Sequence, residues 1–448
     1  MRSIFIKPYV LADPLLINLI KRFKSKFMIE IQKKTIERAI LVALNTRDKK
    51  REIVEEHLEE LEELARTAGA ETVVKIIQEK YSIDPAFYIG KGKAEELSSL
   101  VEINNIDLVI FDDDLSPVQV RNLERLINRK ILDRSGLILD IFASRAKTKE
   151  AKTQVELAQL QYLLPRLTRA WTHLSKQYGG IGTKGPGETQ IETDRRIIRN
   201  RISHLKEKLN KIESEREVQS SGRKDFVKIS IVGYTNAGKS TLFNLLTHSN
   251  VFAEDKLFAT LDSTTRVYNL NKQKVLLSDT VGFIRKLPHH LIASFKSTLN
   301  EVRNSDIILH VIDLSNQYFE DHIRVVEETL DELGCSEKAT LKIFNKVDLV
   351  KDRNRTDYVR DEYKNSVIIS AERGINISTL EKKLLEIIEK SFVTDTIEID
   401  LNNSKLASKI YSLTEVLSTK YYDNTIQITY KVNPANAEKI KNLIKDFN

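Results

Sequence analysis

One stretch of the chain has the residue types and the spacing of a phosphate-binding loop. Residues 233–241 spell G-Y-T-N-A-G-K-S-T, which fits the pattern G-x-x-x-x-G-K-[ST]. An apolar run at residues 227–232 precedes the loop and an amphipathic pattern follows it, so the motif has the strand–loop–helix context that it requires. Glycines let successive backbone N–H groups point at phosphate oxygens, and the helix N-terminus adds partial positive charge. We expect the following residues to contact a nucleotide: Gly233, Tyr234, Thr235, Asn236, Ala237, Gly238, Lys239, Ser240 and Thr241.

Two side chains of this loop have expected catalytic or metal-binding roles. Lys239 should reach the β- and γ-phosphates, and the Ser240 hydroxyl should bind Mg2+. Further along, an apolar strand ends in D-T-V-G at residues 279–282, the D-x-x-G pattern of GTPases. We expect its carboxylate to hold the magnesium ion through water and the Gly282 N–H to meet the γ-phosphate. The residues of this second motif are Asp279, Thr280, Val281 and Gly282.

Two later motifs predict that the base is guanine. N-K-V-D at residues 345–348 follows a buried run, and its carboxylate can accept hydrogen bonds from guanine N1–H and the exocyclic amine, which adenine does not offer there. A second apolar run ends in S-A at residues 370–371, where a backbone N–H can meet guanine O6. The base-binding residues that we predict are Asn345, Lys346, Val347, Asp348, Ser370 and Ala371.

A switch segment is expected between the phosphate-binding loop and D-x-x-G. It comprises Phe258, Ala259, Thr260, Leu261 and Asp262. One threonine hydroxyl should bind Mg2+ in the GTP state, and the spacing alone leaves Thr260, Thr264 and Thr265 open.

Phe283 follows the D-x-x-G motif directly. Many GTPases place a glutamine there to orient the attacking water, and a phenylalanine cannot do so by hydrogen bonding. We therefore predict slow intrinsic hydrolysis and a partner that completes the site. The alternative is that another switch residue orients the water.

The composition limits the class of protein. A chain of 448 residues is long enough for about three domains, each with its own core. A net charge of +7 favours an anionic partner, and a single cysteine, Cys335, excludes an internal disulfide and suits a reducing cytoplasm. No apolar run reaches the length of a membrane span, so we expect no membrane anchor. We also expect the protein to be a monomer. Residues 1–27 are basic and precede Met28, so we interpret them as a poorly ordered extension or a start codon assigned too early.

Residues 38–147 alternate strand and helix patterns, which predicts a small α/β domain. G-K-G-K at residues 90–93 lacks phosphate-loop spacing, so a basic helix-capping turn is the preferred interpretation over a second nucleotide site. The acidic residues 112–114 could hold a metal ion, although we favour a strand-end turn followed by a helix N-cap at Ser116.

Residues 148–225 have the pattern of an antiparallel helical hairpin. Two heptad-like apolar stripes flank a glycine-rich tip at residues 179–189, and Pro165 should kink the first arm. Residues 145–225 hold 18 Lys and Arg against 10 Asp and Glu, which indicates nonspecific contact with an RNA backbone. A solvated structural coiled coil is the alternative. The stripe residues are Leu157, Leu160, Leu164, Leu167, Trp171 and Leu174 in the first arm, and Ile198, Ile202, Leu205, Leu209 and Ile212 in the second.

These patterns predict a multidomain α/β protein. We divide it into an N-terminal extension (1–37), the small α/β domain (38–147), the hairpin (148–225), a P-loop GTPase domain (226–392) and a small C-terminal α+β domain (393–448), in which no chemistry can be recognised.

Residues 38–392 resemble the HflX family of translation-associated GTPases. Outside the nucleotide motifs, the resemblance rests on Y-I-G-K-G-K at 88–93, L-S-P at 115–117, D-R-S-G-L-I-L-D-I-F-A at 133–143, Q-V-E-L-A-Q-L at 154–160, G-P-G-E-T at 185–189 and E-T-D-R-R at 192–196. F-A-T-L-D-S-T-T-R at 258–266 resembles the switch signature of the family, which favours Thr260 as the magnesium ligand. Ala151 and Ser263 depart from the glycine and proline that are usual in the family, and residues 1–37 and 393–448 match less well.

The resemblance implies a cytoplasmic GTPase that binds the large ribosomal subunit and its rRNA through the N-terminal domains. Family members are linked to separating or rescuing ribosomes, and a hydrophobic residue at the position of Phe283 is usual among them. Some members are reported to bind ATP outside the GTPase domain, for which no motif is found here. We therefore expect Mg2+-dependent hydrolysis of GTP to GDP and phosphate. The alternatives are a ribosome-assembly or RNA-remodelling GTPase, or a GTP-regulated binding module with incidental turnover.

Overall fold

The computed structural model describes residues 36–46, 50–168, 186–220, 226–249, 257–258, 263–271, 273–286, 296–400, 403–432, 440 and 443. The predicted N-terminal extension up to residue 35, residues 179–185 of the glycine-rich tip and switch residues 259–262 lie outside this described part, whereas residues 186–189 of the predicted tip already belong to a helix. Contacts divide the chain into two compact units, the first consisting mainly of Met1–Ile212 and the second mainly of Ser297–Asn448, Glu213–Glu254 and Asp262–Arg285.

The first unit contains a four-stranded parallel sheet with the order β2-β1-β3-β4. Strands β1, β3 and β4 are largely buried, as expected where both faces of a parallel sheet are covered, whereas the edge strand β2 is only partly buried. Helices follow the strands in sequence and α3 and α4 pack on one face with a buried aliphatic cluster. The elements are β1 (Glu37–Asn45), α2 (Arg51–Ala68), β2 (Ala70–Glu79), α3 (Lys91–Ile103), β3 (Leu108–Phe111), α4 (Pro117–Ile127), β4 (Lys130–Asp133) and α5 (Arg134–Arg145).

Two turns of this sheet have the capping functions expected from the sequence. Gly90 is the N-cap of α3, and Ser116 is the N-cap of α4 with a complete capping box formed by Gln119. Asp112, which follows β3, is buried and accepts a hydrogen bond of 2.6 Å from Arg134.

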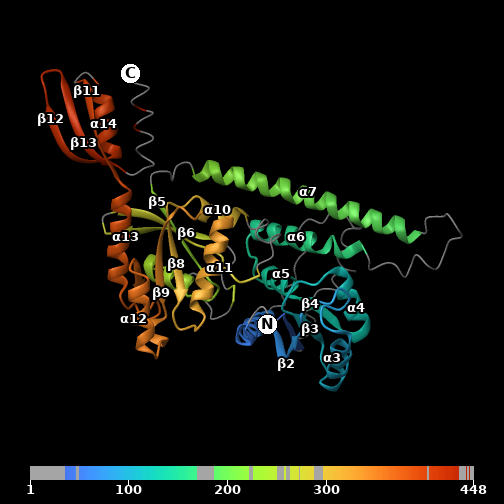
Figure 1. Ribbon diagram of the computed structural model, residues 1–448. Helices are drawn as coiled ribbons and strands as arrows, with labels where there is room; N and C mark the ends of the chain where they lie inside the picture. The colour runs from blue at the N-terminus through green and yellow to red at the C-terminus, as the bar shows by residue number, and fades with distance from the viewer. Residues whose placement is uncertain are drawn as a thin grey trace. The chain divides into compact units, whose positions relative to one another are not determined.

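The hairpin arms lie side by side in Figure 1 as α6 (Lys149–Leu163) and α7 (Pro186–Ser220). Their predicted stripes pack into one apolar cluster, which contains Leu157, Leu160, Leu164, Leu167, Ile198, Ile202, Leu205 and Leu209. The first arm differs from the prediction, because α6 ends before Pro165 and a short 3-10 turn, η1 (Arg166–Thr168), follows. Proline removes a backbone donor and its ring clashes with the carbonyl four residues earlier, so here it ends the helix instead of kinking it. Trp171 and Leu174 lie outside the described residues.

The second unit is built on a six-stranded sheet with the order β10-β9-β8-β5-β7-β6. All neighbours are parallel except β6, which runs antiparallel to β7. The strands are β5 (Val227–Gly233), β6 (Thr264–Leu270), β7 (Gln273–Asp279), β8 (Ile307–Asp313), β9 (Ala339–Asn345) and β10 (Ser366–Ile368). Helices α8 (Lys239–Thr247) and α13 (Ile377–Ser391) share the main buried cluster on one face. Residues of α11 (Phe319–Glu332) and α12 (Arg353–Glu362) pack with the opposite face, and α10 (Lys296–Arg303) precedes β8.

A second, smaller sheet completes this unit. It is antiparallel with the order β11-β13-β12 and packs against α14 through an aliphatic cluster. Its elements are β11 (Val393–Asp400), α14 (Ser404–Leu413), β12 (Glu415–Tyr421) and β13 (Thr425–Val432). The α/β fold class with a P-loop sheet, a helical region and a small C-terminal sheet is thus confirmed.

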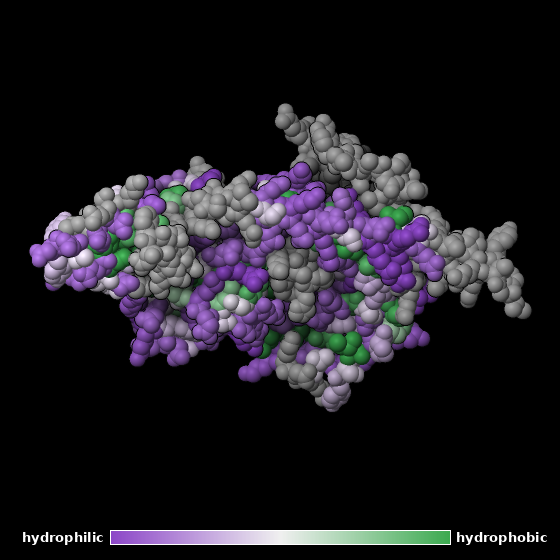
Figure 2. All heavy atoms as spheres, turned by 90° about the horizontal axis from the view of Figure 1, so that it is seen from above, coloured by the Kyte–Doolittle hydropathy of each residue, from purple (hydrophilic) through white to green (hydrophobic). Residues whose placement is uncertain are grey.

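The surface turned to the viewer in Figure 2 is predominantly hydrophilic, with hydrophobic residues in small scattered patches. None of the helices in the described part of the chain has the length and apolar character that a membrane crossing requires.

Candidate functional site

The predicted motifs meet at the carboxyl ends of the parallel strands in the six-stranded sheet. Gly233 ends β5, Asp279 ends β7 and Asn345 ends β9. Carboxyl ends of parallel strands lie at one edge of a sheet, which is where open α/β sheets bind their ligands. The strand order brings together motifs that are far apart in sequence.

Lys239 is the first residue of α8 and lies inside the phosphate-binding loop. Its side chain is buried, and its Nζ donates a 2.7 Å hydrogen bond to the carbonyl oxygen of Tyr234. Burial lowers the pKa of the Lys239 ammonium to about 8, while the nearby Asp279 carboxylate acts in the opposite direction. The loop thus holds its cation in a site that favours a further negative charge beside it.

Ser240 and Asp279 form an oxygen pair next to this lysine. The Ser240 hydroxyl donates a 2.7 Å hydrogen bond to Asp279 Oδ2, and Asp279 is fully buried. Carboxylate and hydroxyl oxygens are the donor types that Mg2+ prefers. The two residues therefore fit a magnesium ion bound between loop and strand.

The D-x-x-G segment runs directly along the phosphate-binding loop. The Phe283 N–H donates to the Gly233 carbonyl oxygen (3.1 Å), and the Thr235 N–H donates to the Phe283 carbonyl oxygen (2.7 Å). A Cβ atom on Gly282 would lie 2.8 Å from Thr235 Cα and 2.9 Å from Lys239 Nζ, so only glycine allows this approach. The Phe283 side chain is 2% exposed, which leaves it buried rather than directed to water.

Asn345 joins two loops of the site through its side-chain amide. Its Nδ2 donates to the Ala237 carbonyl oxygen and its Oδ1 accepts from the Ala371 N–H, each over 2.9 Å. The phosphate-binding loop and the S-A loop are thus held by one buried side chain. Gly238, in the left-handed region at φ +90°, makes room for this amide, because a Cβ atom there would collide with it.

The other guanine-motif residues surround Asn345. Asp348 lies in a 3-10 turn, η3 (Val347–Leu349), with its side chain 16% exposed and 4.0 Å from Arg373 Nε. Lys346 Nζ forms a 2.8 Å ion pair with Asp313. Ser370 is buried and its Oγ accepts a hydrogen bond from the Arg373 N–H.

Only part of the switch segment is described. Phe258 is buried, while Ala259, Thr260, Leu261 and Asp262 lie outside the described residues. The two competing threonines belong to strand β6. Thr264 is the register partner of Asp279, and the Thr265 hydroxyl lies 2.8 Å from the Ser278 hydroxyl. The assignment of the magnesium-binding threonine remains a prediction.

The structure adds residues that no motif marks. Asp313 is the last residue of the buried strand β8 at the same sheet edge, and a carboxylate at the end of an apolar run is a pattern that the sequence shows. Arg285 and His322 also lie beside the phosphate-binding loop, in contact with Tyr234. Neither has a sequence signal, because both fall among ordinary polar residues of a loop and a helix.

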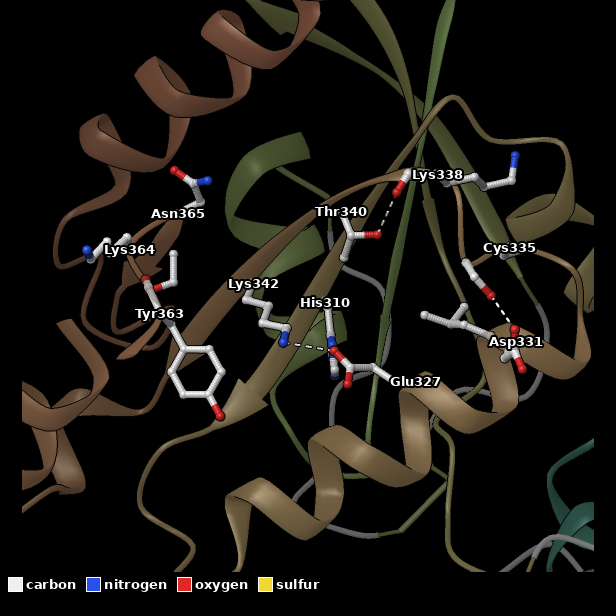
Figure 3. A pocket seen from close by; sticks show the side chains of 13 residues that line it. His310, Glu327, Asp331, Cys335, Lys338, Thr340, Lys342, Tyr363, Lys364 and Asn365 are labelled. Carbon is white, nitrogen blue, oxygen red and sulfur yellow. Dashed lines mark hydrogen bonds and ion pairs between the residues drawn. The ribbon is translucent and has the colours of Figure 1, made fainter. Parts of the chain in front are cut away.

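A cavity of about 650 Å3 lies elsewhere on the six-stranded sheet. Figure 3 shows Lys342 of β9 directed at Glu327 of α11, with His310 of β8 beside them. His310 Nδ1 has no hydrogen-bond partner in the part of the chain that the structure describes. None of the nucleotide-motif residues lines this cavity, so the predicted site is the sheet edge and not the cavity.

Three known families match successive parts of the chain. They are described as GTP-binding GTPase N-terminal (residues 55–143), GTP-binding GTPase Middle Region (145–223) and 50S ribosome-binding GTPase (228–346).

Curated relatives match most of the length. GTPase HflX of Flavobacterium psychrophilum is 46% identical over 81% of this chain and 94% of its own. GTPase HflX of Escherichia coli is 44% identical over 84% of this chain and 89% of its own. Among solved structures, a GTP-binding protein from Sulfolobus solfataricus in complex with GDP aligns with 79% of this chain and 98% of its own, at 27% identity and a TM-score of 0.42.

The identities and the coverage of the curated relatives are high enough to assign the family of this chain. The chain belongs to the HflX family of GTPases, and it is a GTP-hydrolysing enzyme.

Proposed function

We propose that this GTPase binds the large ribosomal subunit and its rRNA in the cytoplasm and acts in translation, in splitting or rescuing ribosomes. The observation that carries the proposal is the match of residues 228–346 to a family described as 50S ribosome-binding GTPase. The basic helical hairpin, which precedes this domain, supplies a surface suited to an RNA backbone.

In this proposal the loop around Lys239 binds the β- and γ-phosphates of GTP. The lowered pKa of Lys239 reflects a buried cation, and phosphate charge would stabilise its protonated form. The Gly282 N–H would donate to the γ-phosphate, whose charge grows in the transition state. Ser240 and Thr260 would bind Mg2+ directly and Asp279 through water. When bound, the ion would neutralise charge on the β- and γ-phosphate oxygens.

Guanine would be recognised by Asp348, with the backbone of Ser370 and Ala371 close to O6. Asn345 supports both ends of this site, since it bonds to the loops that would carry the phosphates and the base. Lys346, anchored on Asp313, would lie along the base.

The burial of Phe283 supports slow hydrolysis in the isolated protein. A buried phenylalanine offers no hydrogen bond to the attacking water, and loss of a water-positioning group lowers the rate strongly. The ribosome would then supply or order the missing group.

Helix α7 offers a basic surface for rRNA. Arg196, Arg199, Lys206 and Lys211 are exposed, while Ile198, Ile202 and Leu205 of the same helix are buried. The basic residues therefore lie on the side away from the packed stripe, where phosphate contacts can form.

The test is the GTP hydrolysis rate with and without purified large ribosomal subunits. We expect a large stimulation that is lost when residues 179–189 are deleted and that weakens with salt. The double variant Arg196→Glu, Arg199→Glu should reduce the stimulation several-fold. The matched double variant Arg353→Glu, Arg360→Glu, at exposed positions of α12, should not.

An unchanged slow rate with large subunits would contradict a ribosomal activator. Co-sedimentation with assembly precursors in place of mature subunits would favour an assembly factor. Stable GTP-dependent binding without stimulated hydrolysis would favour a regulatory binding module.

A further inference from the structure

Three side chains form a buried polar cluster between the phosphate-binding loop and the segment after D-x-x-G. Tyr234 comes from the loop, Arg285 from the segment and His322 from helix α11. Their exposed fractions are 5%, 4% and 9%. The nucleotide motifs require none of these residue types, since Tyr234 occupies a variable position of the loop pattern and the other two lie outside all motifs.

The tyrosine hydroxyl is the centre of the cluster. It accepts two hydrogen bonds from Arg285, one from the backbone N–H (3.0 Å) and one from Nε (3.1 Å). The Tyr234 ring is stacked on the His322 ring, with centroids 3.8 Å apart and planes 4° from parallel. One oxygen atom thus binds both the backbone and the side chain of the same residue.

The guanidinium completes the cluster on the side of α11. Arg285 Nη2 lies 3.2 Å from His322 Nε2, and Nη1 lies 3.6 Å from Asp321 Oδ2. A guanidinium has no acceptor, so Nε2 must accept and the ring proton belongs on Nδ1. We call Tyr234, Arg285 and His322 the switch clamp.

The backbone next to the switch clamp is hydrogen-bonded to the same loop. Phe283 exchanges two hydrogen bonds with Gly233 and Thr235, which continue the pairing of β5 with β7 beyond the strand ends. Counting the two bonds of Arg285, residues 283 and 285 make four hydrogen bonds to residues 233–235. Gly282 is thereby held against Thr235 and Lys239.

We propose that the switch clamp positions the D-x-x-G segment for GTP hydrolysis. This inference rests on the proposed nucleotide site, in which Lys239 and the Gly282 N–H share the γ-phosphate. With Gly282 already beside the ammonium, the segment loses little freedom when GTP binds, and its donor is aligned before the reaction begins. Because the Phe283 side chain offers the attacking water no hydrogen bond, the D-x-x-G segment contributes to catalysis mainly through its backbone N–H donor. Tyr234, Arg285 and His322 are therefore positioning residues.

The variant Tyr234→Phe tests the clamp with the smallest change. It keeps the ring that stacks on His322 and removes the oxygen that accepts both bonds from Arg285. The affinity for a non-hydrolysable GTP analogue should fall about tenfold, because two buried hydrogen bonds are lost. The affinity for GDP should stay within about twofold, because GDP has no γ-phosphate for Gly282 to meet. Single-turnover hydrolysis of bound GTP should slow by at least the same factor as the analogue affinity.

Two further variants separate positioning from general damage. Tyr358→Phe is the matched control, since it removes an exposed hydroxyl that bonds Glu320 (2.6 Å) in the same unit, and it should change neither affinity. Arg285→Lys keeps the backbone N–H bond and a positive charge near Asp321. Its affinity for the GTP analogue should therefore lie between that of the unaltered protein and that of Tyr234→Phe. The double variant should lose little more affinity for the GTP analogue than Tyr234→Phe alone, because the Nε bond to Tyr234 that Arg285→Lys removes is already absent in Tyr234→Phe.

The outcomes distinguish this inference from the proposed function. An equal loss of affinity for GDP and the GTP analogue in Tyr234→Phe would mean that the cluster only stabilises the loop, and it would overturn the positioning role. If Tyr234→Phe changes neither the ratio of the affinities for GDP and the GTP analogue nor the hydrolysis rate, the positioning role is overturned as well. If the unaltered protein itself neither binds the analogue nor hydrolyses GTP, the nucleotide site is wrong, and with it the role of the clamp.

Discussion

Replacing Asn345 by alanine should disable the nucleotide site without touching any atom that we expect to contact phosphate. The Asn345 side chain makes two buried hydrogen bonds, to the Ala237 carbonyl oxygen and from the Ala371 N–H. Asn345→Ala leaves both backbone groups without these partners. An unsatisfied buried group costs about 1–3 kcal/mol, so the two together cost roughly 2–6 kcal/mol.

Part of this cost should appear in nucleotide affinity, because the two loops would carry the phosphates and the base. A loss of only about 2 kcal/mol corresponds to roughly a thirtyfold rise in the dissociation constant for GDP. Titration calorimetry with GDP measures this rise, and hydrogen exchange of the peptide containing Ala371 reports the freed N–H.

Two comparison variants sharpen the test. Asn365→Ala removes an exposed asparagine of the same unit and should leave GDP affinity unchanged. Asn345→Asp keeps an acceptor for the Ala371 N–H but sets a carboxylate oxygen against the Ala237 carbonyl, so affinity should fall while Ala371 stays protected. GDP binding by Asn345→Ala within about threefold of the unaltered protein would refute the reasoning.

Three further changes have defined outcomes. Asp348→Asn should weaken guanine selectivity and admit xanthine nucleotides, and unchanged selectivity in competition binding would remove Asp348 from the base pocket. Gly282→Ala should abolish GTP hydrolysis while GDP still binds, since the added Cβ would lie 2.8 Å from Thr235 Cα; normal turnover would contradict the close approach. Burial lowers the pKa of His310 to about 3 from about 6.5, so the neutral ring contributes stability that is present above pH 6.5 and lost as the pH falls toward 3. When the pH is lowered from 7 to 5, the free energy of unfolding of His310→Gln, measured with urea, should therefore fall by about 2 kcal/mol less than that of the unaltered protein. Equal falls in the two proteins would contradict this prediction.

Much of the fold could be predicted because it rests on local patterns. Apolar runs marked the strands β1, β3, β5 and β9, and Ser116 marked a helix start by its side-chain chemistry. The motif residues Lys239, Asp279 and Asn345 could be named because each follows or opens an element whose type is evident from the sequence.

The contacts between distant residues could not be predicted in the same way. Tyr234 meets His322 only because strand β8 lies beside β5 and α11 follows β8, which is a property of strand order and not of either neighbourhood in the sequence. The end of α6 was misjudged for a related reason, since the apolar stripe continues past Pro165 although the helix does not. Spacing shows which side chains could share a face, but the backbone decides where the helix stops.

The strand order of the six-stranded sheet also determines when the enzyme can fold during its own synthesis. β5 pairs with β7 and β8, both of which are made after it, and Asn345 and Ala371 follow later still. At about 5–20 residues per second, the chain from β5 to Ala371 takes on the order of ten seconds to emerge. The sheet of the first unit is already complete at β4 and can form first. A nascent chain should therefore carry a folded N-terminal sheet well before its nucleotide site exists, and a chain truncated before Ala371 should lack that site altogether.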